Sequence, residues 1–126
     1  MAGNSKFDIQ LNEAQQNEIK LARIFNGEFK IQKIELKSET YMWEQTGNIC
    51  IEYEFNGKPS GIAVTECDMW VHELKRDGET LVYLMFPVER LKELCREAFK
   101  EGRHRKGAGD NAKSKVILLP LGDILK

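Results

Sequence analysis

The chain has 126 residues, of which 41% are apolar and 31% charged, and its formal net charge is −1. This length allows one domain with a modest core, so we treat residues 1–126 as a single domain. No run approaches the roughly 20 apolar residues of a membrane span, and the N-terminal residues lack the apolar region of a signal peptide. We therefore expect a cytoplasmic protein with no membrane partner.

The cysteines are Cys50, Cys67 and Cys95, and no two of them have the C-x-x-C spacing. An odd number of unpaired positions is typical of reduced thiols in a cytosolic protein. With only His72 and His104 as further nitrogen ligands, a structural zinc site is not expected.

Seven elements are predicted in chain order. The first is a helix over residues 11–25, which Asn12 can cap and Asn26-Gly27 ends. Strands follow over 29–39, with a break near Gln32-Lys33, and within 46–61, between turn signals. A short helix is predicted over 65–78, because Thr65 and Asp68 have the capping-box spacing.

The nearly continuous apolar run over 79–86 predicts a buried central strand. Residues 87–102 form the clearest predicted helix, 103–115 a loop, and 115–121 a last strand. This order favours an α/β (α+β) fold, in which helices flank a mixed central sheet.

Four Glu-x-Lys triplets occur, at residues 18–20, 28–30, 35–37 and 73–75. On a helix, residues i and i+2 point about 200° apart, so the first and last triplets are not same-face pairs. Only Glu35-Leu36-Lys37 lies on a strand that another strand follows, where both charges share a face and Leu36 takes the other. A solvated ion pair and half of a metal-dependent active site are the two readings of this triplet.

The next strand carries Glu52 and Glu54 on one face. Several carboxylates near one lysine suit a hard cation such as Mg²⁺, which takes oxygen ligands and keeps several waters. Such an ion orients a water and offsets charge on a phosphate, and a lysine beside it stabilises the developing charge. A surface lattice of ion pairs is the alternative.

Residues 12–86 also resemble a known family. The helix with Glu18, "IELK" on a strand, "NICIEYE", "TECDMWVHEL" and "ETLVYLMF" follow one another as in the PD-(D/E)xK nuclease superfamily. The strings "TGN" and "GKPSGI" look like those of small phage-encoded members. The resemblance implies a restriction-endonuclease-like fold and hydrolysis of nucleic-acid phosphodiesters that depends on Mg²⁺ or Mn²⁺. It also implies that Glu35 and the Leu36 carbonyl bind metal, that Lys37 is catalytic, and that Glu18 is the acid of the first helix.

The family also expects an Asp about ten or more residues before Glu-x-Lys, and none lies between Glu18 and Glu35. Glu28 is the only acid in that interval, and either Glu28 binds the metal in place of the Asp or a carboxylate from elsewhere does. Glu52 is the preferred replacement ligand, ahead of Asp8 and Glu39.

Several residues are candidates for DNA contact. Lys58 and Ser60 lie in "NGKPSGI", which is either a plain turn or a phosphate contact. The segment 100–115 carries six Lys or Arg against Glu101 and Asp110, a local charge of 6 − 2 = +4. This segment is either a charged, solvated loop or an arm that tracks DNA phosphates, in which case its DNA-binding candidates are Arg103, Arg105, Lys106 and Lys113. Trp43, in a polar segment, is the better candidate for base stacking, although it could equally cover a sheet edge, whereas Trp70 is expected in the core.

The sequence and the resemblance together predict a metal-dependent endodeoxyribonuclease. By analogy, the length of the chain suits an enzyme that cuts branched or junction DNA. A homodimer would supply the two sites that double-strand or junction cutting uses. The alternative is a nuclease-like fold that binds DNA or regulates a partner without cleaving.

Overall fold

The computed structural model describes residues 5–25, 33–108 and 113–125. The chain divides into two compact units, residues 1–32 and 33–126, and each is described by itself. The first unit holds helix α1 (Ser5–Phe25), which contains the predicted helix over 11–25 but begins six residues earlier, so Asn12 lies within it and does not cap it. Glu18 is exposed on it, and Glu28 lies outside the described residues. Within the described part of the chain, no helix has both the length and the apolar character to cross a membrane.

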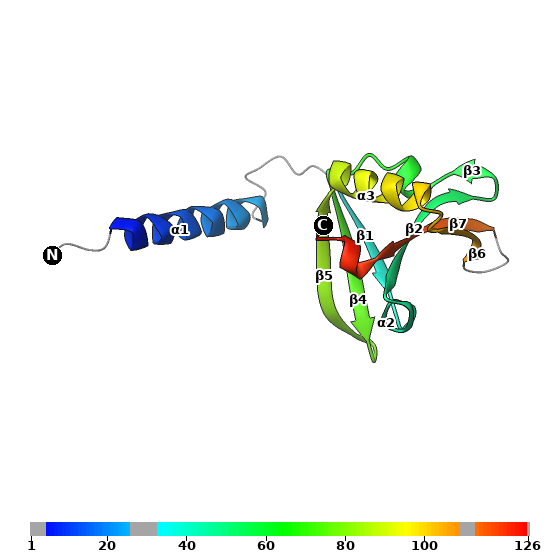
Figure 1. The fold of residues 1–126 in the computed structure, drawn as a ribbon, viewed down its shortest axis with the longest axis horizontal. Coiled ribbons are helices and arrows are strands. Elements are labelled where there is room, and N and C mark those ends of the chain that lie inside the picture. Colours follow the sequence, from blue (N-terminus) through cyan, green and yellow to red (C-terminus); the bar gives the residue numbers. More distant parts are fainter. Residues whose placement is uncertain (1–4, 26–32, 109–112, 126) are drawn as a thin grey trace. The chain divides into compact units, whose positions relative to one another are not determined.

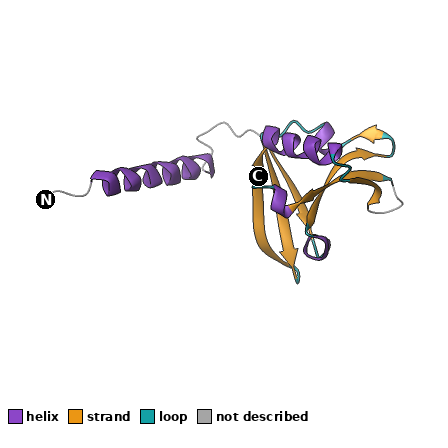
Figure 2. Cartoon of the chain, in the orientation of Figure 1, coloured by secondary structure: helices purple, strands orange, loops and turns teal. Residues whose placement is uncertain are grey.

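The second unit contains two sheets and two α-helices (Figures 1 and 2). Its elements are β1 (Ile34–Glu39), α2 (Met42–Thr46), β2 (Asn48–Phe55), β3 (Lys58–Pro59), the 3₁₀ turn η1 (Gly61–Ala63), β4 (Met69–Arg76), β5 (Glu79–Pro87), α3 (Val88–Lys100), β6 (His104–Ala108), β7 (Ser114–Pro120) and the 3₁₀ turn η3 (Leu121–Asp123). The mixture of helices and sheets agrees with the predicted class, although two sheets replace the single sheet expected.

The first sheet, sheet A, has the order β1-β4-β5. Strand β1 runs parallel to β4, and β4 runs antiparallel to β5, so this sheet is mixed. The second sheet, sheet B, is antiparallel and has the order β3-β2-β7-β6. Helix α3 crosses above both sheets in Figure 1. Below it, the core is formed by buried side chains of both sheets together with Trp43, Ile62, Leu91, Leu94 and Cys95.

The predicted helix over 65–78 is wrong, because Met69–Arg76 forms β4. The residues that suggest a helix cap serve a turn and a neighbouring strand instead. The Thr65 hydroxyl accepts the Cys67 amide at 3.2 Å, and the Asp68 carboxylate accepts the Lys33 amide at 3.1 Å. Local side-chain bonds of this kind compete with helix formation, and the pairing with β1 and β5 then fixes the strand.

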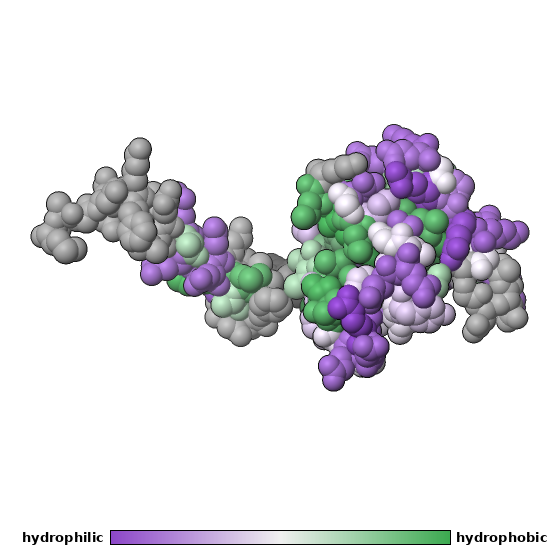
Figure 3. Space-filling view, turned by 60° about the horizontal axis from the view of Figure 1, so that its bottom comes forward, coloured by the Kyte–Doolittle hydropathy of each residue, from purple (hydrophilic) through white to green (hydrophobic). Residues whose placement is uncertain are grey.

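The run over 79–86 does form a strand, but at an edge of sheet A rather than at its centre. Leu81 is 50% exposed and Tyr83 is 55% exposed, so the apolar run is not evidence of burial here. Figure 3 shows that hydrophobic residues also reach the surface of residues 33–126, over a face that hydrophilic residues border. The predicted loop over 103–115 is wrong in part, because His104–Ala108 forms β6.

Candidate functional site

The candidate site is a groove between β1, at the edge of sheet A, and β2 of sheet B. Two cavities that share lining residues form it, with volumes of about 220 and 480 Å³. Their shared residues are Ser38, Glu39, Cys50 and Glu52. The smaller cavity adds Lys37, Trp70 and His72, and the larger adds residues that include Asn48, Arg105 and Ser114. We call these two cavities the β1–β2 groove.

Strand alternation brings Lys37 and Glu39 to the groove. In the parallel register of β1 and β4, Glu35 is level with Trp70, Lys37 with His72, and Glu39 with Leu74. Paired residues share a face, so this set of side chains lies on one side of sheet A. The Lys37 ammonium lies 5.9 Å from the centre of the Trp70 ring, a distance at which a cation is attracted to the ring face.

A chain of hydrogen bonds holds Glu39. The Trp70 indole Nε1–H donates to His72 Nδ1 at 3.2 Å, and His72 Nε2 is hydrogen-bonded to Glu39 Oε2. Because an indole nitrogen only donates, His72 Nδ1 must accept and the ring proton lies on Nε2. Trp70 and His72 are each 1% exposed. The core therefore fixes the position of a carboxylate that lines the groove.

The same carboxylate oxygen accepts a second hydrogen bond. The Cys50 backbone N–H of β2 donates to Glu39 Oε2 at 3.0 Å. Within the described residues, both bonds to Glu39 end on Oε2, which leaves Oε1 for a ligand. Burial raises the pKa of the Cys50 thiol, the nearby Glu39 charge raises it further, and Arg105 opposes the rise. The Cys50 thiol is therefore a neutral group that feels the charges of both the Glu39 carboxylate and the Arg105 guanidinium.

Two hydroxyl groups orient Glu52. Ser114 Oγ donates to its Oε1 at 2.8 Å, and Ser60 Oγ donates to its Oε2 at 3.0 Å. Gly61 secures this arrangement, because a Cβ there would lie 2.1 Å from the Glu52 carbonyl oxygen, and its φ of +52° disfavours other residues. The predicted replacement ligand thus lies in the groove, and Ser60 contacts this acid.

The sequence ranks Glu39 below Glu52, whereas both line the same cavity. The usable signal for Glu39 is its spacing: Glu35, Lys37 and Glu39 are two residues apart on one strand, so their side chains share a face. The sequence gives no such signal for Trp70 and His72. Their segment is predicted to be a helix, in which residues two apart do not share a face. Glu35 is half-buried on the same strand, and Leu36 is 54% exposed with its side chain on the opposite face.

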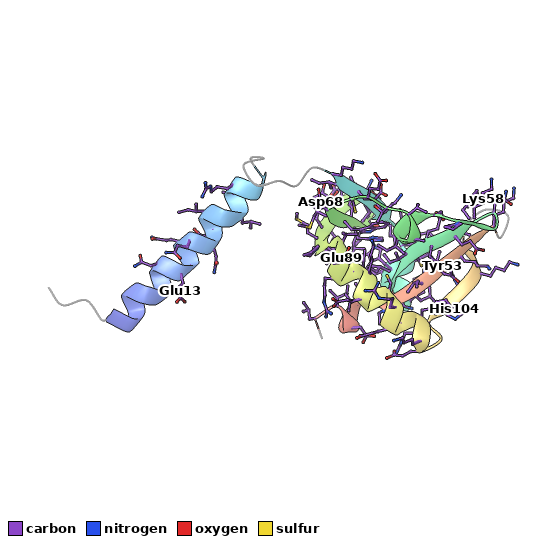
Figure 4. All side chains as sticks on the ribbon, turned by 90° about the horizontal axis from the view of Figure 1, so that it is seen from above. Glu13, Tyr53, Lys58, Asp68, Glu89 and His104 are labelled. Atoms are coloured by element: carbon purple, nitrogen blue, oxygen red, sulfur yellow. The ribbon has the colours of Figure 1, made fainter. Side chains whose placement is uncertain are left out.

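The DNA-contact candidates are dispersed. Arg105 lines the groove, and Lys58 lies at the far end of the β2–β3 hairpin in Figure 4. Arg103 pairs with Glu101 at 2.9 Å, whereas Lys106 and Lys113 are exposed. The predicted stacking role of Trp43 is wrong for this structure. Its side chain is 8% exposed in the core, and its Nε1–H donates to the Lys75 carbonyl at 2.9 Å.

The donor set suits one kind of metal ion. Among the described residues, no group of three His, Cys, Asp or Glu side chains is assembled as a metal site. Glu39 and Glu52 nevertheless provide two carboxylates to one cavity. Mg²⁺ commonly binds through one or two carboxylates and keeps several waters, so these residues fit a hydrated Mg²⁺ better than a fully coordinated ion.

Comparison with known proteins yields no match to the chain among family models, curated proteins or solved structures.

Proposed function

We propose that residues 33–126 form a metal-dependent nuclease domain that hydrolyses DNA phosphodiester bonds in the β1–β2 groove. The observation that carries this proposal is the cavity in which Lys37 meets the carboxylates of Glu39 and Glu52. Lys37 and Glu39 come from sheet A and Glu52 comes from sheet B. Their side chains therefore share a cavity because the two sheets pack together, not because they are neighbours on one hairpin. The mixed sheet A is the part that best suits the restriction-endonuclease-like fold.

Each groove residue has a proposed role. Glu39 and Glu52 would hold Mg²⁺ or Mn²⁺, and the bound ion would lower the pKa of a water and offset phosphate charge. The oxygen of a water forms a bond to phosphorus and releases one proton to solvent, while the bond from phosphorus to the leaving oxygen breaks and that oxygen takes up a proton from solvent. Lys37 stabilises the charge that develops on the phosphate, and Arg105 binds a neighbouring phosphate. Glu35 lines neither cavity of the groove, so Glu39 and Glu52 together take the places of the family's Glu and of its expected Asp.

The remaining proposals concern context. A homodimer would bring two grooves to one branched or double-stranded substrate. All three cysteines lie in the described part of the chain, and all are free thiols, which suits a reducing compartment such as the cytoplasm.

Plasmid nicking with Mg²⁺ or Mn²⁺ tests the proposal. We expect the full chain to nick supercoiled DNA, and Lys37→Ala and Glu39→Gln to reduce the rate at least 100-fold. Lys92→Ala is the matched control, because Lys92 lies on α3 and not in the groove. It is expected to cut like the wild type.

A binding protein without cleavage is the second candidate. It is favoured by Glu52, both of whose oxygens accept serine hydroxyls. If the chain binds linear, supercoiled or branched DNA but cuts none of them with either metal, this second function replaces the first.

A further inference from the structure

A second cavity, of about 460 Å³, lies between α3 and sheet B. We call it the α3 cavity. It is lined by Tyr53, Ile62, Ala63, Lys92, Cys95, Arg96, Phe99, Lys100 and Ile117. None of these residues lines the β1–β2 groove. Its volume is in the range of small-molecule sites.

The walls of the α3 cavity are apolar and partly aromatic. The rings of Tyr53 and Phe99 meet edge to face with their centres 5.9 Å apart, and His104 stacks on Phe99 at 4.3 Å. Figure 4 shows Tyr53 and His104 near the end of α3. Phe99 is 46% exposed although it lines a cavity, which leaves aromatic surface for a ligand. Burial raises the pKa of Cys95 to about 12, so this wall carries no negative charge at neutral pH.

The rim of the α3 cavity is cationic. Lys92, Arg96 and Lys100 follow one another at four-residue intervals, so they project from one side of α3 about 6 Å apart. No Asp or Glu is among the lining residues of this cavity. Lys92 has a partner on its own helix, Glu89, at 3.7 Å. The rim therefore attracts an anion beside an apolar space.

We propose that the α3 cavity binds a small anionic amphiphile, such as an aliphatic or aromatic carboxylate. Its apolar body fills the space against Tyr53 and Phe99, and its carboxylate faces Arg96 between the two lysines. A nucleobase is a poorer occupant, because its polar edge would meet walls that offer few hydrogen-bonding groups. This binding is independent of the proposed nuclease activity, because the two cavities share no lining residue.

Calorimetric titration of the full chain with decanoate, below its micellar concentration, tests the proposal. Decyltrimethylammonium has the same tail and the opposite charge. We expect decanoate to bind in a 1:1 complex and the cation to bind at least tenfold more weakly. Equal affinities would show that the rim charges are irrelevant and would overturn the proposal.

Two substitutions localise the binding. Arg96→Glu places an acid between Lys92 and Lys100, one turn away on each side, so the helix keeps favourable pairs. It should weaken decanoate binding at least tenfold. Ala63→Phe fills the cavity and should abolish binding, with folding checked by circular dichroism.

Lys58→Glu is the control for charge reversal, because Lys58 lies in β3 outside the cavity. It should bind decanoate like the wild type. Unchanged affinity in Arg96→Glu would contradict the proposed site. Binding to anionic phospholipid vesicles without binding to decanoate would assign the rim to a lipid surface and overturn the cavity site.

Discussion

The β1–β2 groove and the α3 cavity have opposite chemistry although they border the same two strands. The larger part of the groove measures about 480 Å³ and the α3 cavity about 460 Å³. Cys50 and Glu52 of β2 line the groove, whereas Tyr53 lines the cavity and Ile51 is fully buried in the core. In β7, Val116 and Leu118 line the groove, and Ile117 lines the cavity.

This difference shows how little sequence is needed to build two kinds of site. Successive side chains of a strand point to opposite faces of its sheet, so one strand supplies an acid to one side and an aromatic ring to the other. The partner strands then decide the rest. Lys37 and Glu39 join the acids of the groove, and the cations of α3 surround the apolar cavity.

The largest expected effect is at Gly61, which lies against Glu52 of the groove and directly precedes Ile62 of the α3 cavity. Gly61→Ala would place a Cβ against the Glu52 carbonyl oxygen and force alanine to a φ of +52°. We expect a loss of about 2–5 kcal/mol of unfolding free energy, from backbone strain and steric overlap together. Urea denaturation measures this loss.

Gly57→Ala is the matched control for Gly61→Ala. Gly57 has a φ of +80°, and an added Cβ there meets nothing within 4 Å. Only the conformational cost of about 1–2 kcal/mol remains. Equal losses in the two variants would mean that the contact between Gly61 and Glu52 does not hold the two sites together.

An intermediate effect is expected at His72, which lies on the groove side of sheet A. His72→Phe leaves the Trp70 indole N–H without its acceptor and removes one bond from Glu39. A buried polar group left unpaired costs about 1–3 kcal/mol, so denaturation should show a loss of that size. Nitrogen NMR of wild-type His72 should show the proton on Nε2. A proton on Nδ1 would contradict the hydrogen-bond chain.

The smallest effect concerns Glu73, on the opposite face of β4 from His72. Hydrogen bonds from the Ser38 and Thr80 hydroxyls lower the pKa of its carboxyl group. A lowered pKa stabilises the fold above the pKa of the unfolded chain, about 4.3, and this stability is lost as the pH falls through the folded value. Glu73→Gln should therefore be less stable than wild type at pH 7, by an amount that shrinks below about pH 4.

Glu79→Gln, at an exposed position of β5, is the charge-neutralising control for Glu73→Gln. A stability difference between wild type and Glu73→Gln that stays constant with pH would mean that the two hydroxyls do not favour the ionised form of Glu73.

Patterns with one physical cause were readable from the sequence. Strand β2 and helix α3 agree with the prediction. In β2 apolar residues alternate along the strand, and in α3 they recur with helical spacing, so in each element the pattern marks one buried face. The site was readable in part, since Lys37 and Glu52 do line one cavity. Whether they act in catalysis stays a prediction.

The failures come from signals that two structures share. Thr65 and Asp68 have the spacing of a helix cap, but their side chains bond a turn and the start of β1. The apolar run of β5 reads alike for a central strand and for an edge strand. Trp43 lies in a polar segment of the sequence, and in the structure its side chain is buried while its indole N–H donates to the Lys75 carbonyl, which is distant in the chain.

Glu39 has a further consequence for the evolution of this protein. Its Oε2 atom accepts bonds from His72 of sheet A and from the Cys50 amide of sheet B, so one carboxylate connects the two sheets. A substitution that frees this acid for chemistry also loosens the architecture, and a substitution that tightens the sheets withdraws the acid from the groove. In the proposed nuclease, activity and stability would therefore be coupled at this single residue, which would restrict the routes by which either can improve.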